Sequence, residues 1–177
     1  MQRHLTELPN RILVGYGVIN EAGSFLDQLG FSGKVLLVSG NATTVNFRER
    51  MAKNLESDGF KVFVSGIMAP SLDDVKKIES IAVNNQVSII ISLGGGKTGD
   101  VAKLSSYNAK IPFVNIPTSA SHDGIASPFA SIKDSAMPYS YSAKPPIGIL
   151  ADIDVISQAP RELLASGCGD LMAKITA

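Results

Sequence analysis

Apolar runs rich in Val, Ile and Leu recur along the chain, separated by stretches in which apolar residues return every three or four positions. Parallel strands that are covered by helices on both faces need such nearly continuous apolar runs. The pattern therefore predicts strands, which lie at 11–14, 34–39, 61–65, 87–93, 111–116 and 147–150. The amphipathic stretches predict helices at 18–29, 47–57, 98–106 and 160–177, and a further helix that begins at Leu72.

Local signals support several of these helix ends. Gly30 and Gly59 stand just beyond two of the helices, where glycine readily adopts the conformation that ends a helix. Ser71 and Asp74 form a capping box in front of the third helix. Strands that alternate with helices predict an α/β fold, with a Rossmann-like, doubly wound parallel sheet. Residues 117–146 are rich in Ser, Ala, Pro and Gly, so the periodicity fades there, and 144–146 is expected to be a rigid loop.

Composition narrows the class of protein. The 177 residues suffice for one ordinary domain with a core, and the 45% of hydrophobic residues indicate a globular chain. Sixteen Lys and Arg balance sixteen Asp and Glu, which gives no reason to expect nucleic acid as a partner. No apolar run approaches the roughly 18 residues of a membrane span. The single cysteine, Cys168, is compatible with a reducing cytoplasm.

The run from Gly94 to Asp100 joins the most apolar strand to a helix and fits the pattern G-x-G-x-x-G. Glycines let the backbone approach an anion closely, and the N–H groups and dipole of a helix N-terminus attract negative charge. We therefore predict that this turn binds the pyrophosphate of a dinucleotide through Gly94, Gly95, Gly96, Lys97, Thr98, Gly99 and Asp100. The alternatives are a tight turn without a ligand and, for Asp100, a favourable charge in the first helical turn.

The triplet Gly96-Lys97-Thr98 also matches the end of an ATP-binding P-loop, G-x-x-x-x-G-K-[ST]. That motif requires a glycine at position 91, where this chain has Ile91 inside the apolar run. ATP hydrolysis is therefore rejected.

The turn after the strand at 34–39 runs from Gly40 to Thr44 and contains no acidic residue. An acid at this place would bind the ribose 2′-hydroxyl and favour NAD. Without one, a 2′-phosphate is not repelled, so use of both NAD and NADP is expected. An ordinary polar loop is the alternative interpretation.

The loop from Pro117 to Ser127 carries several hydroxyl groups together with His122 and Asp123. Open α/β sheets bind ligands at the carboxyl ends of their strands, and this loop follows the strand at 111–116. It contains none of the lysine and glutamate residues that are usual on solvated surfaces. The composition favours a binding loop over a plain surface loop.

Three segments together resemble the glycerol-1-phosphate dehydrogenases, which belong to the superfamily of iron-containing alcohol dehydrogenases, glycerol dehydrogenases and dehydroquinate synthases. The segments are the G-G-G-x-x-x-D helix opening, P-T-x-x-S-x-D-G-x-A-S-P from Pro117 to Pro128, and G-x-G-D from Gly167 to Asp170. The stretch from Ser121 to Pro128 discriminates this family from glycerol dehydrogenases, which often share the glycine run. The resemblance extends from Leu8 to Ala177.

The resemblance implies roles for further residues. Cofactor contacts fall on Thr118, Ser119, Ala120, Ser121 and Ser127. Asp123 matches a substrate-binding aspartate, and Asp170 matches the first ligand of a catalytic Zn²⁺ that also lies against the substrate. The alternative for Asp170 is an ordinary helix residue. His122 receives no catalytic role, and Cys168 is interpreted as a small packing residue.

The family completes its zinc site with two histidines from a following helical domain. This chain has only His4 and His122, and neither follows Asp170. We therefore expect residues 1–159 to form a dinucleotide-binding α/β domain and residues 160–177 to begin a helical domain that is otherwise missing. The chain alone is expected to be inactive.

The resemblance implies an NAD(P)-dependent oxidoreductase that reversibly reduces dihydroxyacetone phosphate to sn-glycerol 1-phosphate for archaeal-type membrane phospholipid synthesis. We expect a cytoplasmic homo-oligomer with a small-molecule substrate and no nucleic-acid partner. Two alternatives stay open. One is a polyol dehydrogenase of the glycerol dehydrogenase type, which needs no site for a substrate phosphate. The other is a non-catalytic dinucleotide-binding module.

Overall fold

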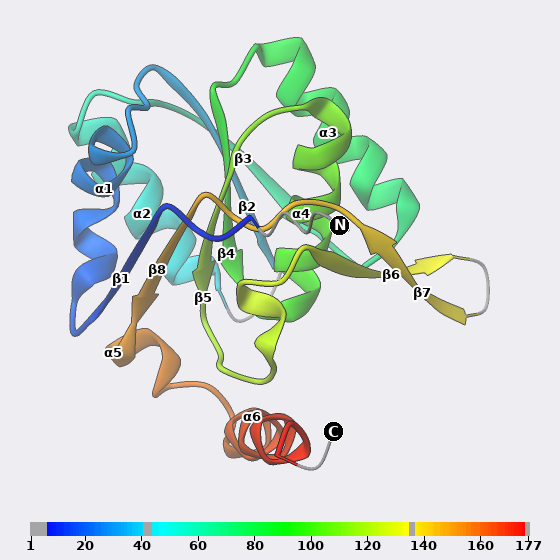
Figure 1. Cartoon of the computed structure of the whole chain (residues 1–177). Coiled ribbons are helices and arrows are strands. Elements are labelled where there is room, and N and C mark those ends of the chain that lie inside the picture. Colours follow the sequence, from blue (N-terminus) through cyan, green and yellow to red (C-terminus); the bar gives the residue numbers. More distant parts are fainter. Residues whose placement is uncertain (1–6, 41–43, 135–136, 176–177) are drawn as a thin grey trace, which may run out of the picture.

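A six-stranded parallel sheet forms the centre of the computed structural model, which describes residues 7–40, 44–134 and 137–175 (Figure 1). The sheet has the order β1-β8-β5-β4-β2-β3. Its strands are β1 (Arg11–Gly15), β2 (Lys34–Gly40), β3 (Lys61–Ile67), β4 (Ile89–Gly94), β5 (Phe113–Pro117) and β8 (Gly148–Asp152). Each overlaps a predicted strand, so the Rossmann-like parallel sheet is confirmed.

Helices cover both faces of this sheet. On one face lie α1 (Ala22–Gln28) and α2 (Val45–Ser57), and on the other lie α3 (Leu72–Asn85) and α4 (Gly96–Ala109). The chain also forms α5 (Ile153–Ile156) and α6 (Arg161–Ala173) after β8, and the short 3-10 helices η1 (Val18–Glu21) and η2 (Asp123–Ile125). Val35 and Leu37 of β2 pack in the same cluster as residues of α1 and α2, whereas Leu36 and Val38 pack with residues of α3 and α4. This central strand is therefore buried on both faces, as its apolar run requires.

The capping box in front of α3 is half confirmed. Ser71 accepts a hydrogen bond from the Asp74 backbone N–H at 3.2 Å, as predicted. The Asp74 carboxylate, however, accepts from the N–H groups of Met68 and Ala69, both at 2.9 Å, instead of reaching back to Ser71. The acid thus fixes the turn between β3 and α3 as well as the helix start.

An antiparallel hairpin of β6 (Phe129–Asp134) and β7 (Met137–Ser142) occupies part of the stretch in which no periodicity was recognised. Among the residues of β6 whose burial is described, 129–133, Ala130 and Ile132 are fully buried, and they pack in the cluster that contains α3 and α4 residues. Ala130 and Ile132 alternate with the exposed Ser131 and Lys133, but so short an alternation is a weak strand signal inside a stretch rich in Ser, Ala and Pro.

Among the described residues, no helix is both long and apolar enough to cross a membrane.

Candidate functional site

A cavity of about 690 Å³ opens at the carboxyl ends of the central strands. The chain order reverses here, because β2 pairs with β3 on one side and with β4 on the other. Ligands of open α/β sheets bind at such a switch point. Seven of the predicted cofactor residues line the cavity: Gly95, Gly96, Lys97, Thr98, Thr118, Ser119 and Ser121.

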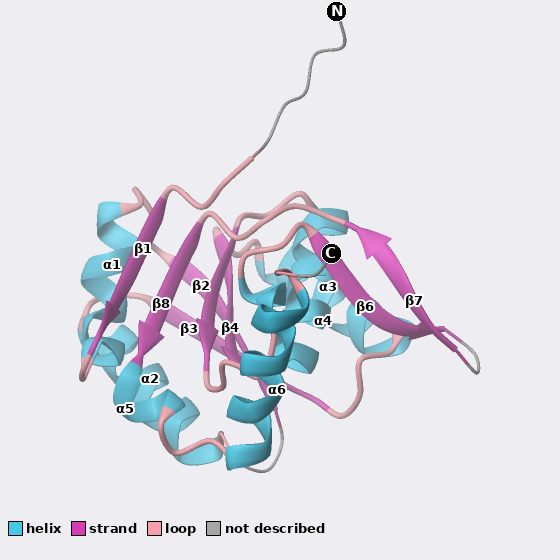
Figure 2. Cartoon of the chain, turned by 60° about the horizontal axis from the view of Figure 1, so that its bottom comes forward, coloured by secondary structure: helices cyan, strands magenta, loops and turns pink. Residues whose placement is uncertain are grey.

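Apart from Thr44, which belongs to the turn expected to meet the cofactor ribose, the other wall of the cavity was not predicted from the sequence. It is built by the segment that follows β8 and by the start of α2, namely Thr44, Phe47, Val155, Gln158, Ala159, Pro160 and Leu163, with His122 closing the rim. Figure 2 shows α5 and α6 at this end of the sheet. The wall depends on tertiary packing, and its residues follow no local motif.

A side chain at either of two positions in the turn from β4 to α4 would displace a neighbouring side chain. A Cβ on Gly94 would lie 2.7 Å from the Thr98 Cβ, and a Cβ on Gly96 would overlap the His122 ring. Thr118 N donates to Gly94 O at 3.0 Å, which joins the two loops at the cavity floor. The turn between β4 and α4 therefore leaves little room for side chains.

Gly95 is the N-cap of α4, and no side chain caps this helix. The first N–H groups of an uncapped helix need partners, and an anion satisfies them well. The 690 Å³ cavity, the glycine-lined helix start and the hydroxyls of Thr118, Ser119 and Ser121 therefore suit a phosphate-bearing dinucleotide. A Cβ on Gly95 would lie 3.1 Å from Ser119 Oγ, between the two loops.

Gly95→Val should weaken NAD(H) binding at least tenfold, which corresponds to about 1.4 kcal/mol. Gly95 has φ −78° and ψ −172°, a region that valine adopts readily, so the backbone should fold normally. The branched side chain would enter the space next to Ser119 that the pyrophosphate requires. Titration by NADH fluorescence measures the effect, with Gly169→Val as control, since a Cβ on Gly169 meets nothing within 4 Å. An unchanged dissociation constant in a folded Gly95→Val chain would remove this turn from the site.

The remaining predicted cofactor residues do not line the cavity. Gly94 and Gly99 border a narrow space behind the turn. Asp100 forms an ion pair with Lys103 at 3.7 Å, and Ser127 Oγ contacts the backbone N and O of Phe129, each at 3.3 Å. For Asp100 the location favours a structural role, with burial raising the pKa of its carboxyl against the lowering effect of Lys103.

A second polar cluster unites the two acids that the resemblance assigned to substrate and metal. The Asp123 backbone N donates to Asp170 Oδ2 at 2.9 Å, although the residues are 47 positions apart. Lys174 Nζ lies 2.7 Å from Asp123 Oδ2 and 3.7 Å from Asp170 Oδ2. The hydrogen bond from Lys174 holds the pKa of Asp123 below its usual value and raises that of Lys174 in return. Lys174 was not predicted, although it follows Asp170 by the four residues that place side chains on one helical face.

Gly167 sets how closely α6 approaches this cluster, because a Cβ there would overlap the Ala120 carbonyl oxygen. Gly167→Ala should therefore push α6 away from the loop. The backbone amides of α6 should then exchange their hydrogens with solvent at least tenfold faster. The helix itself should survive, since alanine favours helix over glycine by about 1 kcal/mol. Hydrogen exchange measured by mass spectrometry provides the test. Gly169→Ala is the matched control, and equal protection of α6 in both variants would contradict this role of Gly167.

The described residues do not by themselves fit a catalytic zinc site. Such sites normally use three protein ligands, whereas no group of three His, Cys, Asp or Glu that could hold a metal lies within the described part of the chain. Asp170 offers a carboxylate at the cluster, while His122 Nδ1 accepts from the Gly124 N–H at 2.9 Å. Any metal would need ligands in addition to Asp170.

Comparison with known proteins shows which family and which relatives the chain resembles. Residues 13–160 match the family model described as iron-containing alcohol dehydrogenase. The whole chain is 44% identical to a glycerol-1-phosphate dehydrogenase [NAD(P)+] of Nitrosopumilus maritimus and 40% identical to one of Saccharolobus islandicus. It covers 50% of each of these two proteins, so it spans about half the length of these curated relatives.

Solved structures show the same fold at low sequence identity. The NADH-dependent butanol dehydrogenase A of Thermotoga maritima matches 99% of the chain with a TM-score of 0.86 and 21% identity, over 50% of its own length. The glycerol dehydrogenase of Schizosaccharomyces pombe matches 98% of the chain with a TM-score of 0.84 and 21% identity, over 44% of its own length. At this identity the likeness concerns the fold alone.

Proposed function

The chain belongs to the iron-containing alcohol dehydrogenase family, and on this premise we propose that it is the dinucleotide-binding half of an NAD(P)-dependent sn-glycerol-1-phosphate dehydrogenase. The reaction converts dihydroxyacetone phosphate, NAD(P)H and a proton into sn-glycerol 1-phosphate and NAD(P)⁺, reversibly. One observation carries the proposal: a single loop connects the two sites. Thr118, Ser119 and Ser121 of this loop line the cavity, and Asp123, further along the same loop, contacts Asp170.

Each part of the site has a task in this proposal. The cofactor supplies the hydride. The start of α4 receives its pyrophosphate, and the hydroxyls of Thr118, Ser119 and Ser121 line its path. Asp123 accepts hydrogen bonds from substrate hydroxyl groups, which orients the carbonyl carbon toward the bound cofactor. The apolar wall that includes Val155 and Leu163 limits the access of water to the cavity.

Both NAD and NADP are proposed as cofactors. Thr44, at the start of α2, lines the cavity on the side of β2. The turn between Gly40 and Thr44 contains no acid in the sequence, so nothing there repels a 2′-phosphate. Residues 41–43 of this turn lie outside the described part of the chain.

A longer protein, in which this chain is joined to the second half of its relatives' length, would be the active enzyme. Zn²⁺ is the proposed metal, with Asp170 as one ligand and the other ligands outside the described residues. The product of the longer enzyme, sn-glycerol 1-phosphate, suggests a role in archaeal-type phospholipid synthesis. We propose that this enzyme is a cytoplasmic homo-oligomer. The names of the relatives, glycerol-1-phosphate dehydrogenase [NAD(P)+], support the dehydrogenase reaction and its cofactors.

The test is a comparison of substrates in the longer enzyme. We expect kcat/KM for dihydroxyacetone phosphate to exceed that for dihydroxyacetone at least 100-fold, about 2.7 kcal/mol of transition-state binding. The reverse reaction should likewise prefer sn-glycerol 1-phosphate over glycerol, with NAD⁺ and with NADP⁺. Equal turnover of phosphorylated and unphosphorylated substrates would instead identify a glycerol dehydrogenase-like enzyme. Dinucleotide binding without turnover on either would identify a non-catalytic module.

A further inference from the structure

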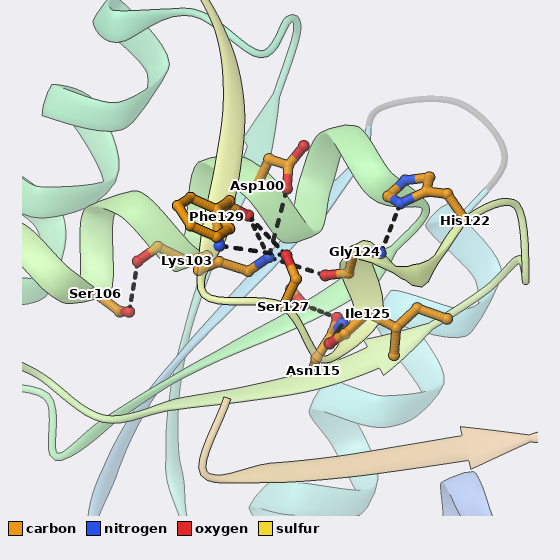
Figure 3. A network of polar contacts seen from close by, with 10 residues as sticks. Asp100, Lys103, Ser106, Asn115, His122, Gly124, Ile125, Ser127 and Phe129 are labelled. Carbon is orange, nitrogen blue, oxygen red and sulfur yellow. Dashed lines mark hydrogen bonds and ion pairs between the residues drawn. The ribbon is translucent and has the colours of Figure 1, made fainter. Parts of the chain in front are cut away.

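The backbone just after Asp123 is held by buried side chains from the floor of the site. Lys103 Nζ donates to Gly124 O at 2.9 Å and to Phe129 O at 2.8 Å. Asn115 Nδ2 donates to Ile125 O at 3.0 Å (Figure 3). Three carbonyl groups of the segment 124–129 thus receive hydrogen bonds from two side chains that belong to other elements.

The two donors come from the elements that also carry the candidate cofactor site. Lys103 is in α4, which begins at the glycine turn, and its side chain is fully buried. Asn115 is in β5, which leads into the loop at 118–122, and its Oδ1 accepts from Ser92 Oγ at 2.6 Å. The segment that carries Asp123 is therefore attached to the same two elements that position the dinucleotide.

Lys103 occupies an environment that disfavours a charged amine. Burial lowers the pKa of Lys103, and the Asp100 carboxylate 3.7 Å away opposes that shift. A buried charged group is costly unless it is paired and hydrogen-bonded, so its partners define where it can lie. Asp100 and the two carbonyls of Gly124 and Phe129 satisfy this lysine, which is absent from the residues that line the cavity.

We propose that Lys103 is a positioning residue that sets the place of Asp123 relative to the bound dinucleotide. By holding the carbonyls of Gly124 and Phe129, it fixes the segment on the carboxyl side of Asp123. It acts on the substrate side of the site and leaves the cofactor cavity unchanged. The part of this inference that concerns substrate rests on the proposed function, whereas the part that concerns the segment rests on the contacts alone.

The test compares Asp100→Asn with the double variant Asp100→Asn/Lys103→Met. Removing Lys103 alone would leave a buried carboxylate without a counter-charge and could unfold the chain. In the double variant both charges are absent, and methionine keeps the approximate shape of lysine. The two proteins therefore differ in the hydrogen bonds to Gly124 and Phe129 and in the buried ammonium of Lys103, which stands without its carboxylate partner in Asp100→Asn. Because an unpaired buried charge only destabilises Asp100→Asn, it works against the faster exchange expected of the double variant. Lys76→Met, in an exposed position of α3, controls for the loss of a lysine elsewhere.

In the double variant, the backbone amide hydrogens of residues 124–129 should exchange with solvent at least tenfold faster than in Asp100→Asn. The dissociation constant for NADH should agree within threefold between the two, as measured with the 177-residue chain. In the longer enzyme, KM for dihydroxyacetone phosphate should rise at least tenfold. A purely structural role would lower the melting temperature without separating substrate KM from NADH affinity.

Equal exchange of residues 124–129 in the two variants would overturn the proposal. A parallel loss of NADH affinity would also overturn it, because Lys103 would then act on the cofactor cavity. If the segment responds as expected but the unaltered longer enzyme does not use dihydroxyacetone phosphate, the proposed function fails. In that case the anchoring role of Lys103 stands.

Discussion

In the longer enzyme, Asp170→Asn should reduce bound metal and turnover together, the latter at least 100-fold, which corresponds to about 2.7 kcal/mol. A neutral amide is a poorer ligand than a carboxylate for Zn²⁺. The local structure should tolerate the change, since the amide oxygen can still accept the hydrogen bond that Asp123 N donates to Asp170. The loss is therefore expected to be chemical and confined to the site.

Metal analysis by mass spectrometry, together with steady-state kinetics, measures this effect. Both zinc and iron should be quantified, because the family takes its name from iron-containing members. Asp123→Ala is the matched comparison, and it should lower turnover while metal stays bound. If Asp170→Asn keeps full metal and a normal rate, Asp170 is not a ligand.

The 177-residue chain alone should show no dehydrogenase turnover. Asp170 provides one carboxylate, and one carboxylate cannot hold zinc well in competition with water. In addition, α6 leaves apolar side chains exposed, among them Leu164 at 57% and Leu171 at 69%. Exposed apolar surface of this kind favours self-association.

Gel filtration followed by metal analysis tests this expectation, with an assay of dihydroxyacetone phosphate reduction in added zinc. We expect substoichiometric zinc, no turnover and oligomers or aggregates larger than the 18.6 kDa monomer. Stoichiometric zinc and clear turnover would show that the chain already contains a complete catalytic site.

The inner strands β2, β4, β5 and β8 were predictable because they are almost entirely buried, whereas the edge strands β1 and β3 are only partly covered. In β2, for example, Val35 to Val38 are all fully buried, and a run of four apolar residues is the direct consequence. The glycine turn was predictable for a similar reason, since Gly94 and Gly96 stand where side chains would collide with Thr98 and His122. Local geometry of this kind leaves a mark in the sequence.

Other features arise from contacts between distant segments and leave no local mark. Lys103 reads as one more polar residue of a helix, yet it is buried by a loop more than twenty residues further along. The wall formed by Val155 and Leu163 depends on how the chain turns back after β8. Asp123 and Asp170 were paired through family resemblance, and the structure supplies the physical contact between them.

Titration of the 177-residue chain with NADH and NADPH tests most directly whether this cavity is a dinucleotide site. The geometry predicts saturable binding of both cofactors, with enhanced nicotinamide fluorescence and at least tenfold weaker binding in Gly95→Val. Absence of saturable binding by a folded chain, or equal binding by Gly95→Val, would contradict the assignment of the cavity to a dinucleotide.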